Sequence, residues 1–236
     1  MVRKVLSDGP GPGQRLRGTP PRLVLIGPPG AGKSTLTPAL IDRFDLARIA
    51  TGERLRAEVA AGSDLGRAAQ EFLERGVLVP DDMMDRVLRA CLDEIPVGKG
   101  FLFDGYPRNP HQAEALDALL AETGRPLTAV LALDLPDQEI LRRLGGRRLC
   151  TGAGEPWTLH VSDTEAVARC RAQGGTLVQR DDDRPEVIAR RLAVYRDETE
   201  PLLVHYREAG LLRTVDATGL PADVQARALG ALTAAQ

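Results

Sequence analysis

The sequence predicts an α/β fold built on a five-stranded parallel sheet with helices on both faces. Five short apolar runs, at residues 23–26, 47–50, 101–103, 129–133 and 211–215, alternate with stretches of helical periodicity. This alternation is typical of parallel sheets wrapped by helices. The chain has 236 residues, of which 43% are hydrophobic, so it can bury the core that such a fold needs.

A glycine-rich loop directly follows the first apolar run. Residues 27–35 read GPPGAGKST and match the phosphate-binding pattern G-x-x-x-x-G-K-[ST] between a strand and a helix. The glycines allow backbone N–H groups to turn inward, and Lys33 can then reach the β- and γ-phosphates of a nucleotide. A plain Gly/Pro turn is the alternative, but the Lys-Ser pair at this offset favours nucleotide binding. We expect the phosphates to contact Gly30, Ala31, Gly32, Lys33, Ser34 and Thr35.

The predicted helices follow from periodicity and from the residues that begin and end helices. Asp81 or Asp82 is a candidate cap for the fourth helix, Asn109 opens the fifth, and Pro201 interrupts the seventh. Between residues 149 and 179 the periodicity is lost among Gly, Thr and Cys. The predicted helices span residues 36–44, 52–61, 64–75, 82–95, 109–124, 136–148, 185–206 and 221–233.

Composition excludes several other classes of protein. A net charge of −2 and an aromatic content of 3% argue against nucleic acid and anionic membranes as partners. Three cysteines do not make a disulfide framework. The first 22 residues lack the apolar segment of a secretory signal, and no apolar run approaches membrane-spanning length. We expect a soluble cytoplasmic protein in which residues 1–21, rich in Gly and Pro, form a flexible extension.

Several charged residues are candidates for the binding site at the carboxyl ends of the predicted strands. Ligands of parallel α/β sheets bind beyond the carboxyl ends of the strands, and Asp104 follows the third apolar run. Its carboxylate is placed to hold magnesium or its waters, although a strand-end turn is the simpler alternative. Arg143 and Arg147 lie four residues apart on one helix, so both point the same way. Arg180 precedes three aspartates and Arg191 borders an apolar stripe, but a single arginine is more often a surface group than a ligand.

Five segments together resemble the adenylate kinase family. They are residues 27–35, 51–56, 104–108 with Gln112, 146–148, and 180–183 with Arg191, in the family's order and spacing. The resemblance covers residues 22 to about 225. It implies a P-loop core with two inserts. The core would comprise residues 22–49, 80–146 and 181–236, with a nucleoside-monophosphate-binding insert at 50–79 and a lid at 147–180.

The resemblance also implies a reaction, in which ATP and AMP give two ADP, reversibly and with Mg²⁺. Ser34 and Asp104 would hold the magnesium, the latter through water, and the family is usually monomeric. The transferring phosphoryl group would be surrounded by Lys33, Arg108, Arg143, Arg147, Arg180 and Arg191. The remaining ATP contacts would come from Trp157 and Gly219 beside the loop. AMP would contact Thr51, Arg56, Val77, Leu78, Val79, Gly105, Tyr106, Pro107, Arg108, Gln112, Arg180 and Arg191.

Some roles keep simpler alternatives at this point. Thr51 could cap a helix, and Gln112 could bond back to Asn109 within a helix cap. The pair Gly145-Gly146 is either a lid hinge or a frayed helix end. For the whole chain, a kinase for UMP or CMP, a kinase using GTP, or a sensor that binds adenine nucleotides without turnover remains open.

The sequence departs from the family pattern mainly in the lid. Many long lids bind zinc with four cysteines, but those positions here are Cys150, Ala153, Cys170 and Gln173. Two thiolates do not complete a tetrahedral zinc site, so we expect no zinc, and a cytosolic compartment argues against a disulfide. We expect apolar packing around Trp157 and Leu159, with polar contacts of Gln173 and Thr176, to hold the lid. Elsewhere, Ser34, Ala50 and Glu53 replace the family's usual glycine, serine and aspartate.

Overall fold

A five-stranded parallel sheet forms the centre of the computed structural model, which describes residues 20–75, 79–152 and 154–233. Its strand order is β2-β3-β1-β4-β8. Central strand β1 pairs on both sides, so that Leu23 lies opposite Leu102 and Ala129. The strands are β1 (Arg22–Ile26), β2 (Ala47–Ile49), β3 (Phe101–Asp104), β4 (Ala129–Asp134) and β8 (Leu212–Asp216). The predicted fold class is therefore confirmed.

Helices cover both faces of this sheet because successive side chains of β1 point in opposite directions. Val24 and Ile26 belong to one buried cluster, and Leu23 and Leu25 to the other. The first cluster includes residues of α4 (Asp81–Asp93), α5 (Pro110–Glu122) and α9 (Pro201–Glu208). The second includes residues of α1 (Lys33–Phe44), α6 (Asp137–Gly146), α8 (Pro185–Val194) and α10 (Pro221–Thr233). Each helix thus buries its apolar face against the sheet or against its neighbours there.

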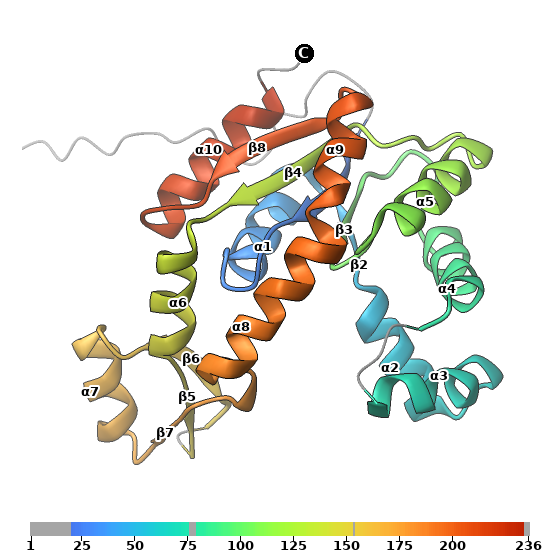
Figure 1. The fold of residues 1–236 in the computed structure, drawn as a ribbon. Coiled ribbons are helices and arrows are strands. Elements are labelled where there is room, and N and C mark those ends of the chain that lie inside the picture. Colours follow the sequence, from blue (N-terminus) through green and yellow to red (C-terminus); the bar gives the residue numbers. More distant parts are fainter. Residues whose placement is uncertain (1–19, 76–78, 153, 234–236) are drawn as a thin grey trace, which may run out of the picture.

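Two smaller units project from this body, at opposite sides in the view of Figure 1. One is the helix pair α2 (Thr51–Ala61) and α3 (Asp64–Arg75). The other, which we call the β5–β7 unit, is an antiparallel sheet of order β6-β5-β7 with one helix. Its elements are β5 (Arg147–Thr151), β6 (Trp157–His160), α7 (Thr164–Ala172) and β7 (Thr176–Val178). The phosphate loop lies in the body between the two units.

Three local predictions are wrong. No side chain caps α4, because Pro80 rather than an aspartate occupies the cap position. Helix α6 ends at Gly146 instead of residue 148, since Arg147 already has extended backbone (φ −70°, ψ 135°). The run from α8 to α9 continues past Pro201 through a π-helical turn, Tyr195–Thr199, in which the Glu200 N–H donates to the Tyr195 carbonyl at 2.9 Å. A wider turn accommodates a proline, which has no N–H to donate.

The β5–β7 unit has its own small core, and here the structure corrects the expectation of free thiols. Cys150 on β5 and Cys170 on α7 are both buried and form a disulfide, with their Cα atoms 6.0 Å apart. The expectation rested on the redox conditions of the cytosol, whereas the small buried cluster of this unit brings the two cysteines together. Leu159 is buried beside them and Trp157 packs against the cluster, with the Arg169 guanidinium 4.5 Å from its ring centre. Of the expected polar contacts, Thr176 makes one, since its carbonyl oxygen accepts from the Thr151 hydroxyl at 3.4 Å, while both Gln173 and Thr176 are exposed outside this cluster.

Replacing both Cys150 and Cys170 with alanine is expected to destabilise the β5–β7 unit by about 2–4 kcal/mol, because the cross-link restricts its unfolded chain. Trp157 is the only tryptophan in the sequence and lies against the disulfide cluster, so its fluorescence reports this unit. We expect its urea midpoint to fall well below the midpoint followed by far-UV circular dichroism. Cys91→Ala, which removes the free cysteine, is the control. An unchanged Trp157 transition in the double variant would contradict this expectation.

Candidate functional site

The loop after β1 presents its lysine at the centre of the molecule. Gly30 and Gly32 have left-handed backbone (φ 82° and 94°), which a side chain would disfavour, and Gly32 leads directly into α1. Ser34 and Thr35 are exposed at the start of that helix, so their hydroxyls face solvent at the loop. Lys33 Nζ donates to the carbonyl oxygens of Gly27, at 2.5 Å, and of Pro28, at 3.1 Å. The loop therefore already holds its lysine in place.

The electrostatic surroundings of Lys33 identify its neighbours. The pKa of Lys33 is lowered from 10.5 to about 8, chiefly by burial and to a smaller extent by the nearby Arg191 and Arg108, while Asp104 acts in the opposite direction. Desolvation by the surrounding protein also lowers the pKa of Arg108, although the residue is exposed to solvent. Three predicted site residues from distant parts of the chain thus act on one ammonium group. A cation held near others in this way is stabilised by an anionic ligand.

A short 3₁₀ turn, η1 (Asp181–Asp183), holds Arg191 together with two more of the predicted arginines. Asp183 is fully buried and accepts two hydrogen bonds from Arg147, at 2.7 and 2.5 Å. Asp182 accepts from Arg180 Nε at 3.0 Å, and its carbonyl oxygen accepts from Arg191 at 3.0 Å. Arg147 Nη2 also lies 4.0 Å from the Asp182 carboxylate. Two aspartates therefore offset the repulsion among three guanidinium groups and fix their positions.

Arg143 joins a different part of the site. It lies on α6, donates to Glu139 at 2.8 Å, and reaches the segment after β8 with its Nη2 atom. There it donates to the carbonyl oxygens of Ala217 at 2.9 Å and Gly219 at 3.4 Å. Arg142 and Arg143 lower the pKa of Glu139 to about 2, so this carboxylate stays ionised. The structure thus brings together Arg143 and Gly219, two residues for which ATP contacts are predicted.

The segment after β3 is shaped around Arg108. Its backbone N–H donates to the side-chain oxygen of Gln112 at 2.9 Å, and its Nε donates to the carbonyl of Gly105 at 3.0 Å. Asn109 caps α5 by accepting from the Gln112 N–H at 2.9 Å, so Gln112 does take part in a cap, as the alternative proposed. The Gln112 side chain is nevertheless buried. The Tyr106 hydroxyl donates to the Gln112 backbone carbonyl oxygen at 3.2 Å. The buried Pro107 follows Tyr106 through a cis peptide bond.

The structure decides the role of Thr51 only in part. Ala50 holds the cap position of α2 and Thr51 is the first residue of the helix, so the capping alternative is wrong. Thr51 is buried, with 5% of its surface exposed. The other residues predicted to contact the nucleotides lie in different parts of the structure. Arg56 is exposed on α2, Val79 is buried before α4, and Trp157 packs in the β5–β7 unit. Val77 and Leu78 lie outside the described residues.

Asp104 ends β3 beside the loop, as predicted, but it has a partner that sequence reasoning missed. Arg48 on β2 donates to Asp104 Oδ2 through Nε, at 3.1 Å, and Nη2, at 2.8 Å. A carboxylate and the exposed Ser34 hydroxyl are oxygen donors of the kind that Mg²⁺ prefers, usually with phosphates and waters completing its shell. The donor chemistry therefore fits magnesium. Nothing in the local sequence around Arg48 distinguishes it from other arginines, because its role depends on the neighbouring strand.

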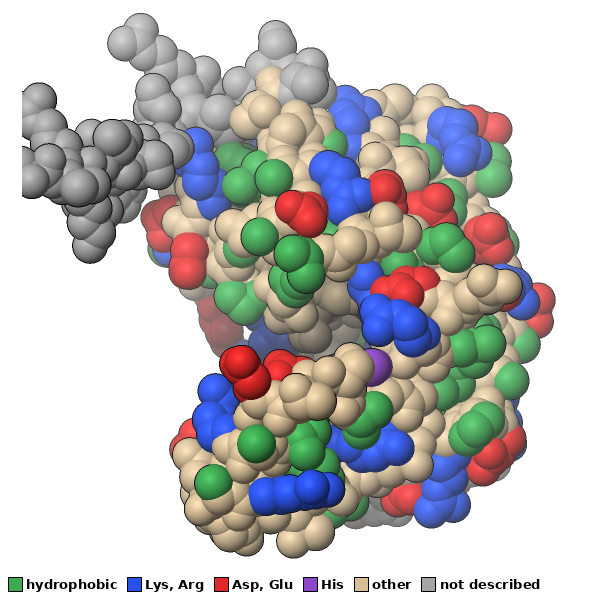
Figure 2. All heavy atoms as spheres, turned by 90° about the vertical axis from the view of Figure 1, so that its left-hand side faces the viewer, with side chains coloured by type: hydrophobic (Ala, Val, Ile, Leu, Met, Phe, Trp, Pro, Cys, Tyr) green, Lys and Arg blue, Asp and Glu red, His purple; other side chains and the backbone are tan. Residues whose placement is uncertain are grey.

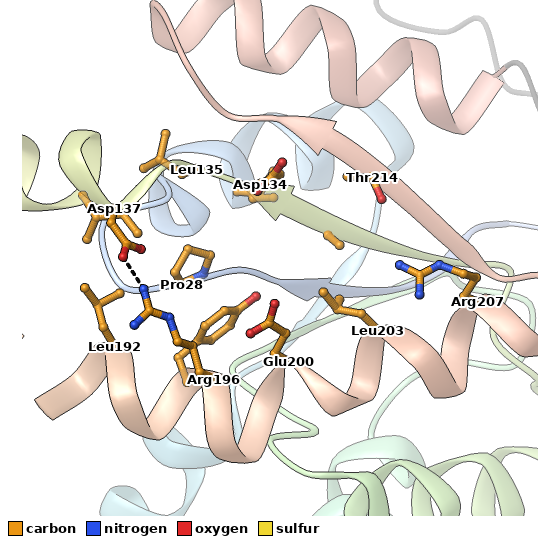
Figure 3. Close-up of a pocket in the computed structure, with 14 residues that line it drawn as sticks. Pro28, Asp134, Leu135, Asp137, Leu192, Arg196, Glu200, Leu203, Arg207 and Thr214 are labelled. Carbon is orange, nitrogen blue, oxygen red and sulfur yellow. Dashed lines mark hydrogen bonds and ion pairs between the residues drawn. The ribbon is translucent and has the colours of Figure 1, made fainter. Parts of the chain in front are cut away.

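A cavity of about 340 Å³ lies between the carboxyl end of β4 and the run from α8 to α9, and Pro28 of the phosphate loop is part of its lining. Figure 3 shows Arg196 and Asp137 paired across one end of it, with Glu200, Leu203 and Arg207 along the helical wall. Burial, Glu200 and Asp134 raise the pKa of its Tyr195 hydroxyl to about 12. None of the predicted site residues lines this cavity. The phosphate loop therefore remains the candidate site. In the space-filling view of Figure 2, a hollow with charged side chains on its rim separates the part of the molecule at the bottom of the view from the rest.

The sheet, the loop after its central strand and the half-buried Lys33 define a P-loop nucleotide-binding protein. Comparison with known proteins narrows this class, since residues 25–211 match the family model described as adenylate kinase. The adenylate kinase of Thermodesulfovibrio yellowstonii is 44% identical over 198 residues, or 84% of this chain and 92% of that protein. The adenylate kinase of Streptomyces griseus is 43% identical over 214 residues, or 90% and 98%. The chain belongs to the adenylate kinase family.

Proposed function

We propose that this protein is an enzyme that transfers a phosphoryl group from ATP to AMP, giving two ADP, in a reversible reaction. The observation that carries this proposal is the convergence on Lys33 of Asp104, Arg108 and Arg191, with Arg147 and Arg180 joined to Arg191 through Asp182. Phosphoryl transfer depends on positioning and on fixed positive charge around the transferred group. No observation favours another acceptor, another donor or a sensor without turnover.

We assign the two projecting units to substrate binding. Residues 50–79, with α2 and α3, would form the AMP-binding insert, and residues 147–180, with the β5–β7 unit, would form the lid over ATP. The core would then comprise residues 22–49, 80–146 and 181–236. Support comes from the way both units project from the body on either side of the loop (Figure 1). We further propose a cytoplasmic monomer without nucleic-acid or membrane partners; every described helix is too short or too polar to cross a bilayer.

The proposed ATP contacts divide between phosphates and adenine. Backbone N–H groups of Gly30 to Thr35 would hold the phosphates at the start of α1, where the helix dipole also favours anions. Lys33 would exchange its bonds to two carbonyl oxygens for bonds to phosphate, a stronger acceptor for a cation. Gly219, held through its carbonyl by Arg143, would contact adenine. Trp157 would contact ATP from the lid.

The AMP site would use the buried group around Arg108. Thr51, Gln112 and Tyr106 are buried close to that segment or at the start of α2, so a monophosphate bound there would be shielded from water. Arg108 would contact its phosphate, while its backbone stays fixed by the Gln112 side chain. The other contacts with AMP would come from Gly105, Pro107, Val79, Val77, Leu78, Arg56, Arg180 and Arg191. The acceptor phosphate would then face the Lys33 end of the loop.

Mg²⁺ would be held by Ser34 and, through water, by Asp104. When bound, magnesium neutralises charge on the polyphosphate and orients it. The chain's own contribution is the set of cations: Lys33 and the arginines fixed by Asp182 and Asp183 would stabilise charge on the equatorial oxygens during transfer. Closure of the lid would exclude water, which is the unwanted acceptor.

The direct test is an assay of ADP formation from ATP and AMP with Mg²⁺, run beside UMP, CMP and GMP as acceptors and GTP as donor. We expect ADP with AMP at a kcat/KM at least about a hundredfold above that of the other acceptors. Comparable rates with UMP or CMP would assign a different monophosphate kinase. Tight binding of ATP and AMP without ADP formation would assign a sensor.

A further inference from the structure

Arg48 connects two carboxylates that come from different parts of the fold. On one side it donates to Asp104 Oδ2 at 3.1 and 2.8 Å. On the other it donates to both oxygens of Glu53 in the first turn of α2, at 3.0 and 2.9 Å. All three guanidinium nitrogens are therefore engaged, and the planar fork lies fixed between β3 and α2.

The exposure of these groups indicates that the link does little for folding. Arg48 is 40% exposed at its side chain and Glu53 57%, and ion pairs this accessible to water contribute little to stability. Asp104 differs, because its side chain is only 15% exposed and its charge acts on Lys33 in the phosphate loop. The functionally relevant partner of Arg48 is thus the Asp104 carboxylate beside the phosphate loop.

Both hydrogen bonds from Arg48 end on the same carboxylate oxygen, which leaves Oδ1 of Asp104 outside this pair. A guanidinium bonded to one oxygen fixes the plane of the carboxylate and neutralises part of its charge. A divalent cation that approaches the free oxygen, directly or through water, then meets a weaker anion and a nearby positive charge. Arg48 is hydrogen-bonded to this carboxylate and is therefore placed to produce both effects.

We propose that Arg48 is a positioning residue that orients the Asp104 carboxylate and weakens its attraction for the divalent cation that accompanies ATP, while Glu53 anchors Arg48. The inference rests on the proposed function, because it assigns a regulator to the same site. Its consequence is a lower magnesium affinity with correct orientation, so that the cation can leave with product instead of remaining on the enzyme.

The test measures how strongly magnesium and ATP assist each other's binding. Calorimetry gives the Kd of ATP in the presence of EDTA and in the presence of saturating Mg²⁺. The Kd in EDTA divided by the Kd with Mg²⁺ is the coupling ratio. For Arg48→Gln we expect this ratio to rise about three- to tenfold, since a positive charge beside the carboxylate is lost. Arg48→Lys keeps the charge and should stay within about twofold of wild type, while its kcat falls because one ammonium cannot hold both carboxylates.

Arg54→Gln is the matched control, since Arg54 also joins two carboxylates, Glu58 and Glu94, but does so away from Asp104. Its coupling ratio should equal that of wild type. An unchanged ratio in Arg48→Gln, or an equal change in Arg54→Gln, would overturn the inference and make Arg48 an ordinary surface residue. Failure of the proposed function is a distinct outcome: wild-type protein would form no ADP, while the coupling ratio can still be measured because it needs no turnover.

Discussion

We expect Lys33→Met to lower the rate of phosphoryl transfer by about a thousandfold or more while the fold remains intact. The loss follows because Lys33 would supply a fixed charge to the transferring group in a site largely closed to water, where single donors of this kind contribute about 10² to 10³ in rate. The β-sheet and its two buried clusters do not depend on the ammonium group, which donates hydrogen bonds to the loop carbonyls of Gly27 and Pro28. ADP formation at saturating ATP and AMP measures the effect.

The same variant is expected to be more stable than wild type at neutral pH. Burial lowers the pKa of Lys33 from 10.5 to about 8, so between these values the unfolded chain binds more protons than the native protein. Stability contributed by this group therefore rises as pH increases from about 8 to 10.5, and below about 8 the buried charge has its full unfavourable effect. Methionine removes that effect, so the melting temperature at pH 7 should rise and the variant should lose this part of the pH dependence.

Lys99→Met serves as the control for both measurements. Lys99 pairs with Asp45 at 3.2 Å on the outside of the molecule, and its side chain is 36% exposed. We expect its activity to stay within about twofold and its stability within about 0.5 kcal/mol of wild type. Activity of Lys33→Met within tenfold of wild type would remove Lys33 from the proposed mechanism.

Much of the body could be predicted from local sequence because its signals are local. The loop has a fixed pattern next to a strand, and buried strands such as Phe101–Asp104 are short apolar runs. The strands and the helix of the β5–β7 unit escaped prediction because the strands have three to five residues and the helix offers only a small apolar face of Ala166, Val167 and Cys170. Such short elements obtain their stability from mutual packing and from the disulfide, which periodicity does not report.

The arginines of the site show a different limit. Their positions were predicted by resemblance to a family, whereas the groups that hold them were not. Arg147 and Asp183 are 36 residues apart, and Arg48 and Asp104 are 56 apart. No local spacing connects such pairs, because only the packed sheet and its helices bring them within hydrogen-bonding distance. Anchoring residues therefore become visible only in three dimensions, although they decide where the functional cations lie.

Asp183→Ala is expected to lower both stability and activity, and it tests this dependence. Asp183 is fully buried and receives two hydrogen bonds from Arg147, so alanine leaves a half-buried guanidinium without its main partner. Breaking one side of such a pair costs about 3–5 kcal/mol. A freed Arg147 would also lose its fixed orientation beside Arg180 and Arg191, so we expect kcat to fall about ten- to a hundredfold. Urea unfolding and ADP formation measure the two effects.

Asp181→Ala, two residues earlier on the same turn, separates these effects from a general change in η1. Asp181 pairs with Arg184 at 2.6 Å, but its side chain is 89% exposed, so water replaces the lost partner at little cost. We expect this control to resemble wild type in both assays. If Asp183→Ala lost stability but kept its kcat, Asp183 would be a folding residue only, and the position of Arg147 during transfer would have to be fixed by the nucleotide phosphates themselves.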